Sequence, residues 1–201
     1  ALLNLPLPPM DVLLTQLYGV IMVLNLFGIV VASCIIYSIE FKGNAGKKMH
    51  LLPISVSKMY LSKFIILTVT LFMAIAIQNI ALMKIGITEL PTGTFETGTL
   101  ISFALYSFIT SMPVLAFMLL IASRFENIWV PLGIGVAGFL SAMALSTVKT
   151  ELFLIHPFVV MFRPAVAMSA EPNPMIVVVS IVETILFFAA GLCMSKELRY
   201  E

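Results

Sequence analysis

The side chains of this sequence that could do chemistry are few, and several lie inside long apolar runs. Glu183 is an acidic residue within such a run, where a charge costs several kcal/mol unless it is neutralised or reaches water. Asn25, Gln78 and Asn79 are amides at similar depth. Such groups line a polar route for a substrate or form hydrogen bonds between helices. We predict all four as substrate-pathway candidates, with interhelical packing as the alternative for the amides and contact with water near a helix end as the alternative for Glu183.

A second set of candidates lies in a stretch that prolines interrupt, residues 150–174. The apolar segments 152–155 and 159–162 are separated by His156-Pro157-Phe158 and followed by Arg163-Pro164. The stretch is too apolar for an exposed loop and too broken for a span. We expect two short half-helices that dip into the outer leaflet, because irregular backbone at that depth persists only where protein buries it or it lines a cavity. His156, Phe158 and Arg163 are the candidate residues of an external gate.

Motifs for autonomous catalysis are missing from the sequence. It has no G-x-x-x-x-G-K-[ST] phosphate-binding loop, so the chain cannot be its own ATP motor. Cys34 and Cys193 lie singly in apolar runs, and His156 has no second His or paired Cys nearby, so we predict no metal site and no catalytic residue. An intramembrane enzyme would need paired acids, a His cluster or a Ser–His pair at membrane depth, and Glu183 has only His156 as a remote companion.

Composition identifies the elements that must position these residues. Of the 201 residues, 61% are apolar and 10% are charged, whereas soluble domains carry about 25% charged residues. A hydrocarbon core about 30 Å thick is crossed by about 20 helical residues, and backbone groups in lipid must be paired within the segment. The sequence therefore predicts an all-α, polytopic transmembrane helix bundle in a single domain, 1–201. Five runs are long enough to span: 12–39, 64–83, 97–123, 127–148 and 175–195.

The distribution of basic residues predicts the orientation of these spans. The net charge of +1 gives no signal for nucleic acid. Most of the 11 Lys and Arg lie in the segment 40–63, at Arg124 and in the tail after residue 195, which marks that side as cytoplasmic. We therefore expect a multi-pass plasma-membrane protein with a cytoplasmic C-terminus. The N-terminal residues would then be external, and we expect that a further span precedes Ala1, which would give a parent of six spans.

The cytoplasmic segment 40–63 has the features of a partner-binding helix. Asn44 can cap a short helix, on which Lys47 and Lys48 form a basic face and Leu51 supplies an apolar edge. Such a helix lies on the membrane surface or fits a groove in a partner, and attraction to anionic lipid is the alternative role for its lysines. The predicted contact residues are Asn44, Lys47, Lys48, His50, Leu51, Leu52 and Pro53.

Small residues in the fourth run predict a close helix contact. Gly133, Gly135 and Gly138 leave room for a neighbouring helix to approach. The neighbour could be a second copy of the chain or another helix of the same chain.

Glu40 after the first run, the turn Leu51-Leu52-Pro53-Ile54-Ser55 and the helix start from Lys58 to Ser62-Lys63 resemble the ABC-2 type permeases of ABC transporters. The resemblance is to the small permeases of lantibiotic immunity and other peptide export in particular. The stretch around His156-Pro157-Phe158 resembles the external re-entrant region of that family. The resemblance implies six spans and a coupling helix in the 40–63 segment that sits in a cleft of a cytoplasmic ATPase. The family's first span has no counterpart from Ala1 onward, which agrees with the expectation that it precedes this residue.

The resemblance also implies a function. The chain would be the permease subunit of an ATP-driven exporter of amphipathic or antimicrobial peptides. Its partners would be an ABC ATPase subunit, a second permease chain, identical or related, the lipid bilayer and the peptide. ATP and magnesium would be bound by the ATPase, with no cofactor on this chain. A non-transporting assembly or sensory subunit and an intramembrane enzyme are the alternatives.

Overall fold

The computed structural model describes residues 9–41, 55–90, 94–146, 154–166 and 171–197, and within them it consists of α-helices and short turns without a strand. The predicted all-α helix bundle is therefore confirmed. The helices are α1 (Pro9–Phe41), α3 (Val56–Glu89), α4 (Thr97–Ala122), α5 (Trp129–Ser146), α6 (Pro157–Val166) and α7 (Pro174–Glu197).

Four of these helices are long and apolar enough to cross a membrane: α1, α3, α4 and α7. They contain the predicted runs 12–39 and 64–83, nearly all of 97–123, and 175–195. The fourth predicted run, 127–148, forms the shorter apolar helix α5 instead. Its 18 residues extend about 27 Å, slightly less than the hydrocarbon core. The described chain is thus a multi-pass membrane protein with four candidate spans and two shorter apolar helices, and a span over 127–148 stays a prediction.

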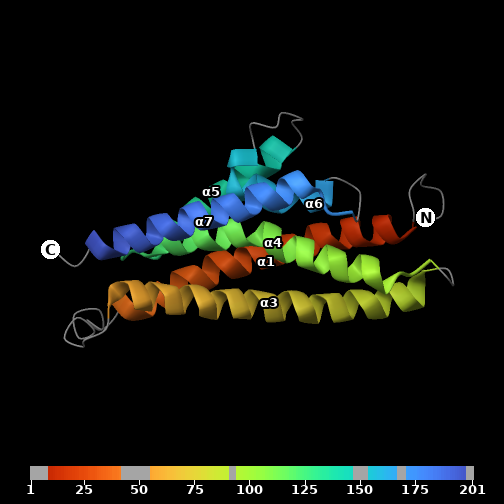
Figure 1. The fold of residues 1–201 in the computed structure, drawn as a ribbon, viewed down its shortest axis with the longest axis horizontal. Coiled ribbons are helices and arrows are strands. Elements are labelled where there is room, and N and C mark those ends of the chain that lie inside the picture. Colours follow the sequence, from red (N-terminus) through yellow and green to blue (C-terminus); the bar gives the residue numbers. More distant parts are fainter. Residues whose placement is uncertain (1–8, 42–54, 91–93, 147–153, 167–170, 198–201) are drawn as a thin grey trace.

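The four long helices run along the longest axis of the molecule (Figure 1). The ends of α1 and α7 and the beginning of α3 lie at one end of the bundle, which we call the hairpin end (Phe41, Val56 and Glu197). The opposite end holds the beginnings of α1, α4 and α7. Helices α1 and α3 are therefore antiparallel, whereas α4 and α7 run in the same direction.

Helix α4 lies at the centre and contacts every other described helix. Half of its 26 residues are buried, including the hydroxyl residues Thr110 and Ser111. The Thr110 hydroxyl donates to the Tyr106 carbonyl at 3.1 Å, and the Ser111 hydroxyl donates to the Ser107 carbonyl at 2.7 Å. These buried hydroxyls are satisfied within their own helix, so their small side chains permit close packing without leaving polar groups unpaired.

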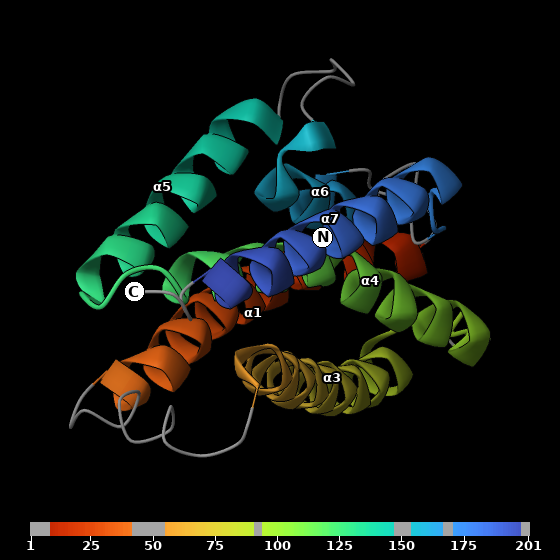
Figure 2. The ribbon, with the colours of Figure 1, turned by 60° about the vertical axis from the view of Figure 1, so that its left-hand side comes forward.

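Helix α6 is buried among α1, α4, α5 and α7, and α5 lies on the outside of this group (Figure 2). Seven of its ten residues are buried. We predicted two half-helices in 150–174. In the described part of this stretch the structure has one helix, α6, preceded by a short 3₁₀ turn at residues 154–155. Residues 150–153 and 167–170 lie outside the described part of the chain. The proline positions explain the result, because Pro157 begins the helix, where a missing N–H costs nothing, and Pro164 follows near its end.

The glycines of α5 make contacts within the chain. A Cβ at Gly135 would lie 2.6 Å from Val30 of α1, and a Cβ at Gly138 would lie 2.6 Å from the ring of Phe158 in α6. A Cβ at Gly133 would have no neighbour within 4 Å. The sequence left open whether these glycines face a second copy of the chain or another helix of the same chain. At Gly135 and Gly138 the structure shows a helix of the same chain.

These contacts predict opposite effects of the same substitution along one helix. Gly138→Ala forces the added methyl against the buried Phe158 ring, and we expect a loss of about 1–3 kcal/mol in the free energy of unfolding. Gly133→Ala is the matched control, which we expect to be neutral or slightly stabilising because alanine is the better helix former. Thermal unfolding in detergent, followed by circular dichroism, measures both. Equal melting temperatures for the two variants would contradict the contact.

Candidate functional site

The predicted coupling residues lie outside the described part of the chain. These are Asn44, Lys47, Lys48, His50, Leu51, Leu52 and Pro53, and their contact with an ATPase stays a prediction. The structure does describe the helices on either side of them. Glu40, at the end of α1, forms a half-buried ion pair with Lys63 of α3. The ammonium of Lys63 also lies 3.6 Å from the centre of the Tyr37 ring, a cation–π contact.

This contact joins two residues on which the family resemblance rests. Sequence reasoning placed Glu40 and Lys63 at the two borders of the cytoplasmic segment but did not predict that they pair. Their opposite charges, at the two borders of a segment that connects two helices, could have indicated the pair.

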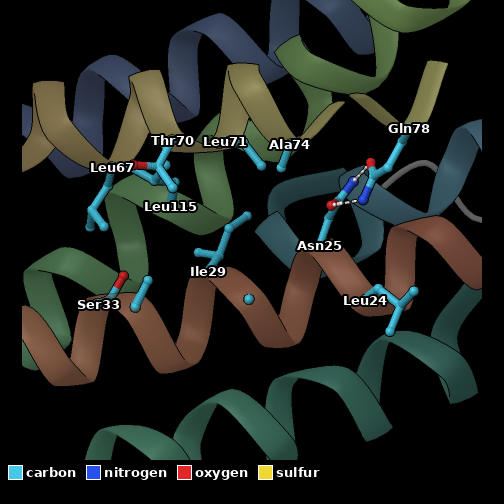
Figure 3. A pocket seen from close by; sticks show the side chains of 12 residues that line it. Leu24, Asn25, Ile29, Ser33, Leu67, Thr70, Leu71, Ala74, Gln78 and Leu115 are labelled. Atoms are coloured by element: carbon cyan, nitrogen blue, oxygen red, sulfur yellow. Dashed lines mark hydrogen bonds between the residues drawn. The ribbon is translucent and has the colours of Figure 1, made fainter. Parts of the chain in front are cut away.

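Asn25 and Gln78 form a reciprocal amide pair between α1 and α3. The Asn25 Nδ2 donates to Gln78 Oε1 at 2.9 Å, and the Gln78 Nε2 donates to Asn25 Oδ1 at 2.7 Å (Figure 3). The two amides thereby satisfy each other in the region where lipid supplies no partner. This geometry favours the packing role of the pair, and its contact with a substrate stays a prediction.

The ion pair and the amide pair hold the helical hairpin in a fixed register. Asn25 precedes Glu40 by 15 residues on α1, and Gln78 follows Lys63 by 15 residues on α3. Fifteen residues of α-helix extend about 22 Å. Because the two spacings are equal, both pairs can form at once between straight antiparallel helices.

A cavity of about 270 Å³ lies between these two pairs, which we call the α1–α3 groove. Apolar side chains form most of its wall, and Asn25, Gln78, Ser33 and Thr70 add polar groups (Figure 3). The full lining is Leu24, Asn25, Gly28, Ile29, Ala32, Ser33, Leu67, Thr70, Leu71, Ala74, Gln78 and Leu115. Sequence reasoning identified the amides but not the groove, because a cavity depends on side chains that face each other across two helices.

Asn79 is adjacent to Gln78 but faces a different neighbour. Its Nδ2 donates to the Ile75 carbonyl of its own helix at 2.8 Å. Its Oδ1 is buried without a hydrogen-bond partner among the described residues. It lines a nearly apolar cavity of about 340 Å³ between α3 and α4. The structure therefore separates Asn79 from the Asn25–Gln78 pair.

Glu183 is a buried residue of α7, the helix that packs along α4. Its side chain is 7% exposed, and neither carboxylate oxygen has a hydrogen-bond partner in the described part of the chain. The rings of Phe117 and Phe187 are 5.2 Å apart where these two helices pack. Helices α4 and α7 run in the same direction (Figure 1). Glu183 precedes Phe187 by four residues, and Pro113 precedes Phe117 by four residues. Glu183 of α7 therefore lies at about the level of Pro113 of α4. The alternative in which Glu183 reaches water at a helix end is not what the structure shows.

Pro113 adds to the polarity of this region. Proline has no N–H to donate, so the carbonyl four residues earlier, that of Ile109, loses its usual partner in the helix. One turn above Glu183, Ser180 is fully buried, and its hydroxyl donates to the Ile176 carbonyl at 2.7 Å. A buried acid thus lies at the level of a proline in the neighbouring span.

The three predicted gate residues lie on and just before α6. The His156 Nε2 is 3.2 Å from the Ser141 Oγ of α5, and its ring packs near Phe158, with centroids 5.6 Å apart. Burial lowers the pKa of His156, which favours the neutral ring. Phe158 is buried against Phe117 and Gly138. Arg163 is half-buried, and its Nε has no hydrogen-bond partner among the described residues.

Ser141 and His156 form a Ser–His contact that sequence reasoning missed. The Ser141 hydroxyl also lies 2.9 Å from the Gly138 carbonyl, to which it donates, so the imidazole is not its only hydrogen-bond partner. The His156 Nδ1 is buried without a partner among the described residues, whereas a catalytic imidazole has a group that orients its second nitrogen. The geometry is that of a packing contact between α5 and the start of α6. Within the described ranges, no three His, Cys, Asp or Glu residues lie close enough to hold a metal ion.

A bundle of apolar spans joined by interhelical polar pairs defines a multi-pass helical membrane protein. The family model of ABC-2 family transporter proteins matches residues 9–144, and the chain belongs to this family. No curated protein and no solved structure matches the chain. It is therefore a membrane permease subunit of an ABC transporter, a transport component that is not itself an ATPase, and the family implies an ABC ATPase as its partner in general.

The amide pair predicts a measurable coupling energy. In a double-mutant cycle of Asn25→Leu and Gln78→Leu, we expect a coupling of about 0.6–1.7 kcal/mol, the range of interhelical hydrogen bonds in membranes. Unfolding in detergent and denaturant, followed by circular dichroism, supplies the four free energies. Asn79→Leu is the matched control, whose amide bonds to its own helix and should show no coupling to Asn25. A coupling of zero between Asn25 and Gln78 would refute the pair.

Proposed function

We propose that this permease moves amphipathic peptides, including antimicrobial ones, out of the bacterial membrane or cytoplasm. Membership of the ABC-2 family supports ATP-driven transport. The resemblance of the 40–63 segment to permeases of lantibiotic immunity supports peptides as the cargo and export as the direction. In this proposal the hairpin end of the bundle faces the cytoplasm of a bacterial cell, where a second permease chain and the ATPase subunits complete the transporter.

The observation that carries the peptide proposal is the buried carboxylate of Glu183, which has no hydrogen-bond partner among the described residues. A buried charge is costly without a partner of opposite charge. Antimicrobial peptides that act on membranes combine apolar faces with Lys and Arg side chains. When α4 and α7 separate, Glu183 would pair with a cationic side chain of such a peptide, and the apolar walls of the same interface would cover its apolar face.

Coupling to ATP would pass through the helical hairpin. Residues 44–53 would sit in a cleft of the ATPase, and closure of the ATPase on nucleotide would move them. The ion pair of Glu40 and Lys63 joins the two helices that flank this segment. A displacement at the hairpin end would therefore reach α1 and α3 together, and through their contacts with α4 it would reach the α4–α7 interface.

The first prediction concerns Glu183 itself. Glu183→Leu removes a buried acid without a partner, and we expect it to raise the free energy of unfolding by about 1–3 kcal/mol. The same variant should lose the stimulation of ATP hydrolysis by a cationic amphipathic peptide, because the peptide loses its counter-charge. Ser180→Ala is the matched control on the same face, and we expect it to keep the peptide stimulation. A destabilised Glu183→Leu that still responds to the peptide would exclude this role.

The second prediction concerns the coupling segment. We expect an ABC ATPase to co-purify with the native chain in mild detergent and to be lost when Lys47, Lys48, Leu51 and Leu52 are changed to Asp. These changes remove both the basic face and the apolar edge that would fill the cleft of the ATPase. Mass spectrometry of the purified complex measures the loss.

Arg124→Asp provides the control for charge alone. Arg124 is exposed in the turn after α4, on the predicted cytoplasmic side, and its reversal should leave the ATPase bound. Retention of the ATPase by the fourfold variant would place coupling elsewhere. If the fourfold variant keeps the ATPase, and neither a peptide nor a change in the permease alters ATP hydrolysis, the non-transporting assembly or sensory subunit would be favoured.

A further inference from the structure

We propose that the α1–α3 groove binds one acyl chain of a phospholipid from the leaflet on the hairpin side. The groove has a cavity of about 270 Å³, space for about nine groups of the size of a water molecule or a methylene. Its wall is mostly apolar, and three of its lining residues, Leu24, Gly28 and Thr70, are exposed on the outer surface of the bundle. At this depth the medium outside the bundle is lipid, so the groove is open to acyl chains.

The length of the groove matches one leaflet. Along α1 it extends from Leu24 to Ser33, about 14 Å, and along α3 from Leu67 to Gln78, about 17 Å. Half of a hydrocarbon core is about 15 Å thick. The two polar pairs show where these ends lie. Leu67 is one helical turn from Lys63 of the charged pair, which belongs near the membrane boundary, and the Asn25–Gln78 pair closes the deeper end.

Ser33 supplies a polar group at the boundary end of the groove. Its side chain is fully buried, and its hydroxyl has no hydrogen-bond partner among the described residues. Several hydroxyls in the spans donate to a carbonyl one turn earlier, as Thr70 does to Ile66 at 2.8 Å and Ser180 does to Ile176 at 2.7 Å. The hydroxyls of Ser33 and Thr68 do not, and of these two only Ser33 lines the groove. The Ser33 side chain instead extends from α1 toward α3 (Figure 3).

An unpaired buried hydroxyl is costly, and a ligand that accepts its hydrogen bond removes that cost. Ser33 is seven residues, about 10 Å, deeper than Glu40 of the charged pair, so the ester carbonyl of a phospholipid would reach it from the boundary by entering this end of the groove. The acyl chain that follows the ester is apolar and of the length that the groove accommodates. One lipid chain therefore matches the hydroxyl, the apolar wall and the depth of the site together. The site is defined by the hairpin end of the bundle. Only the statement that this end faces the cytoplasm rests on the proposed function.

Photolabelling tests the proposal on the full chain without ATPase or peptide. The protein is placed in lipid nanodiscs that contain a phosphatidylcholine with a diazirine within one acyl chain, irradiated and mapped by mass spectrometry. We expect adducts on residues 24–33 and 67–78 well above those on equally exposed apolar residues of α7, such as Val178 and Ile185. Labelling of all these sites in proportion to their exposure would overturn the proposal.

Two variants on α1 form a matched pair. A Cβ at Gly28 or at Gly19 has no neighbour within 4 Å, so both positions accept a larger side chain. Gly28→Phe fills the mouth of the groove, and we expect its adducts in the groove to fall to the level found on α7. Gly19→Phe lies on the same helix outside the groove and should leave them unchanged. Unchanged groove labelling in Gly28→Phe would refute the site.

Ser33→Ala tests the hydrogen bond separately from the apolar fit. We expect it to reduce groove labelling by roughly two- to tenfold, the range that corresponds to one net hydrogen bond. No reduction would remove the ester from the proposal. Covalent dimers joined through the groove, with no lipid adduct there, would show that a second copy of the chain occupies it. Because no ATP hydrolysis or transport enters the measurement, its result is independent of the proposed function.

Discussion

The structure depends on the close packing of α4 against all of its neighbours. In lipid the helices gain no hydrophobic energy from association, so van der Waals contact and interhelical hydrogen bonds must hold them together. Helix α4 meets this constraint with small hydroxyl residues that satisfy themselves, as Thr110 and Ser111 do. The other helices then arrange around it, with α7 and α6 on the side of Phe117. The burial of α6, which is too short to span, follows from this central helix.

The apolar composition was sufficient to predict the helix class and the positions of the long spans, because a charge-free run in lipid has few alternatives to a helix. Apolarity alone does not show where the helix of the fourth run, 127–148, begins, and the structure starts it at Trp129. The Gly135 and Gly138 contacts depended on which helix faces α5. That choice belongs to tertiary packing and is absent from the local pattern.

The candidate polar residues were visible in the sequence, but their partners were not. Asn25 and Gln78 are 53 residues apart, and no local signal indicates that they pair while Asn79 does not. Glu183 was recognised as unusual, whereas its burial depends on the helices packed around α7. The predicted coupling residues lie outside the described ranges, so their role still rests on the resemblance and on membership of the ABC-2 family.

The equal spacing of the two polar pairs has a mechanical consequence. A hairpin of two helices joined at one level can pivot or slide about that contact, but one joined at two levels about 22 Å apart resists both motions. Helices α1 and α3 then move as a rigid body, and a small rotation applied at the hairpin end becomes a larger displacement at the far end. Beyond Gln78, α3 continues to Glu89, and Asn79, Ile80 and Met83 line a cavity between it and α4, so the far end of the hairpin would press directly on the central helix.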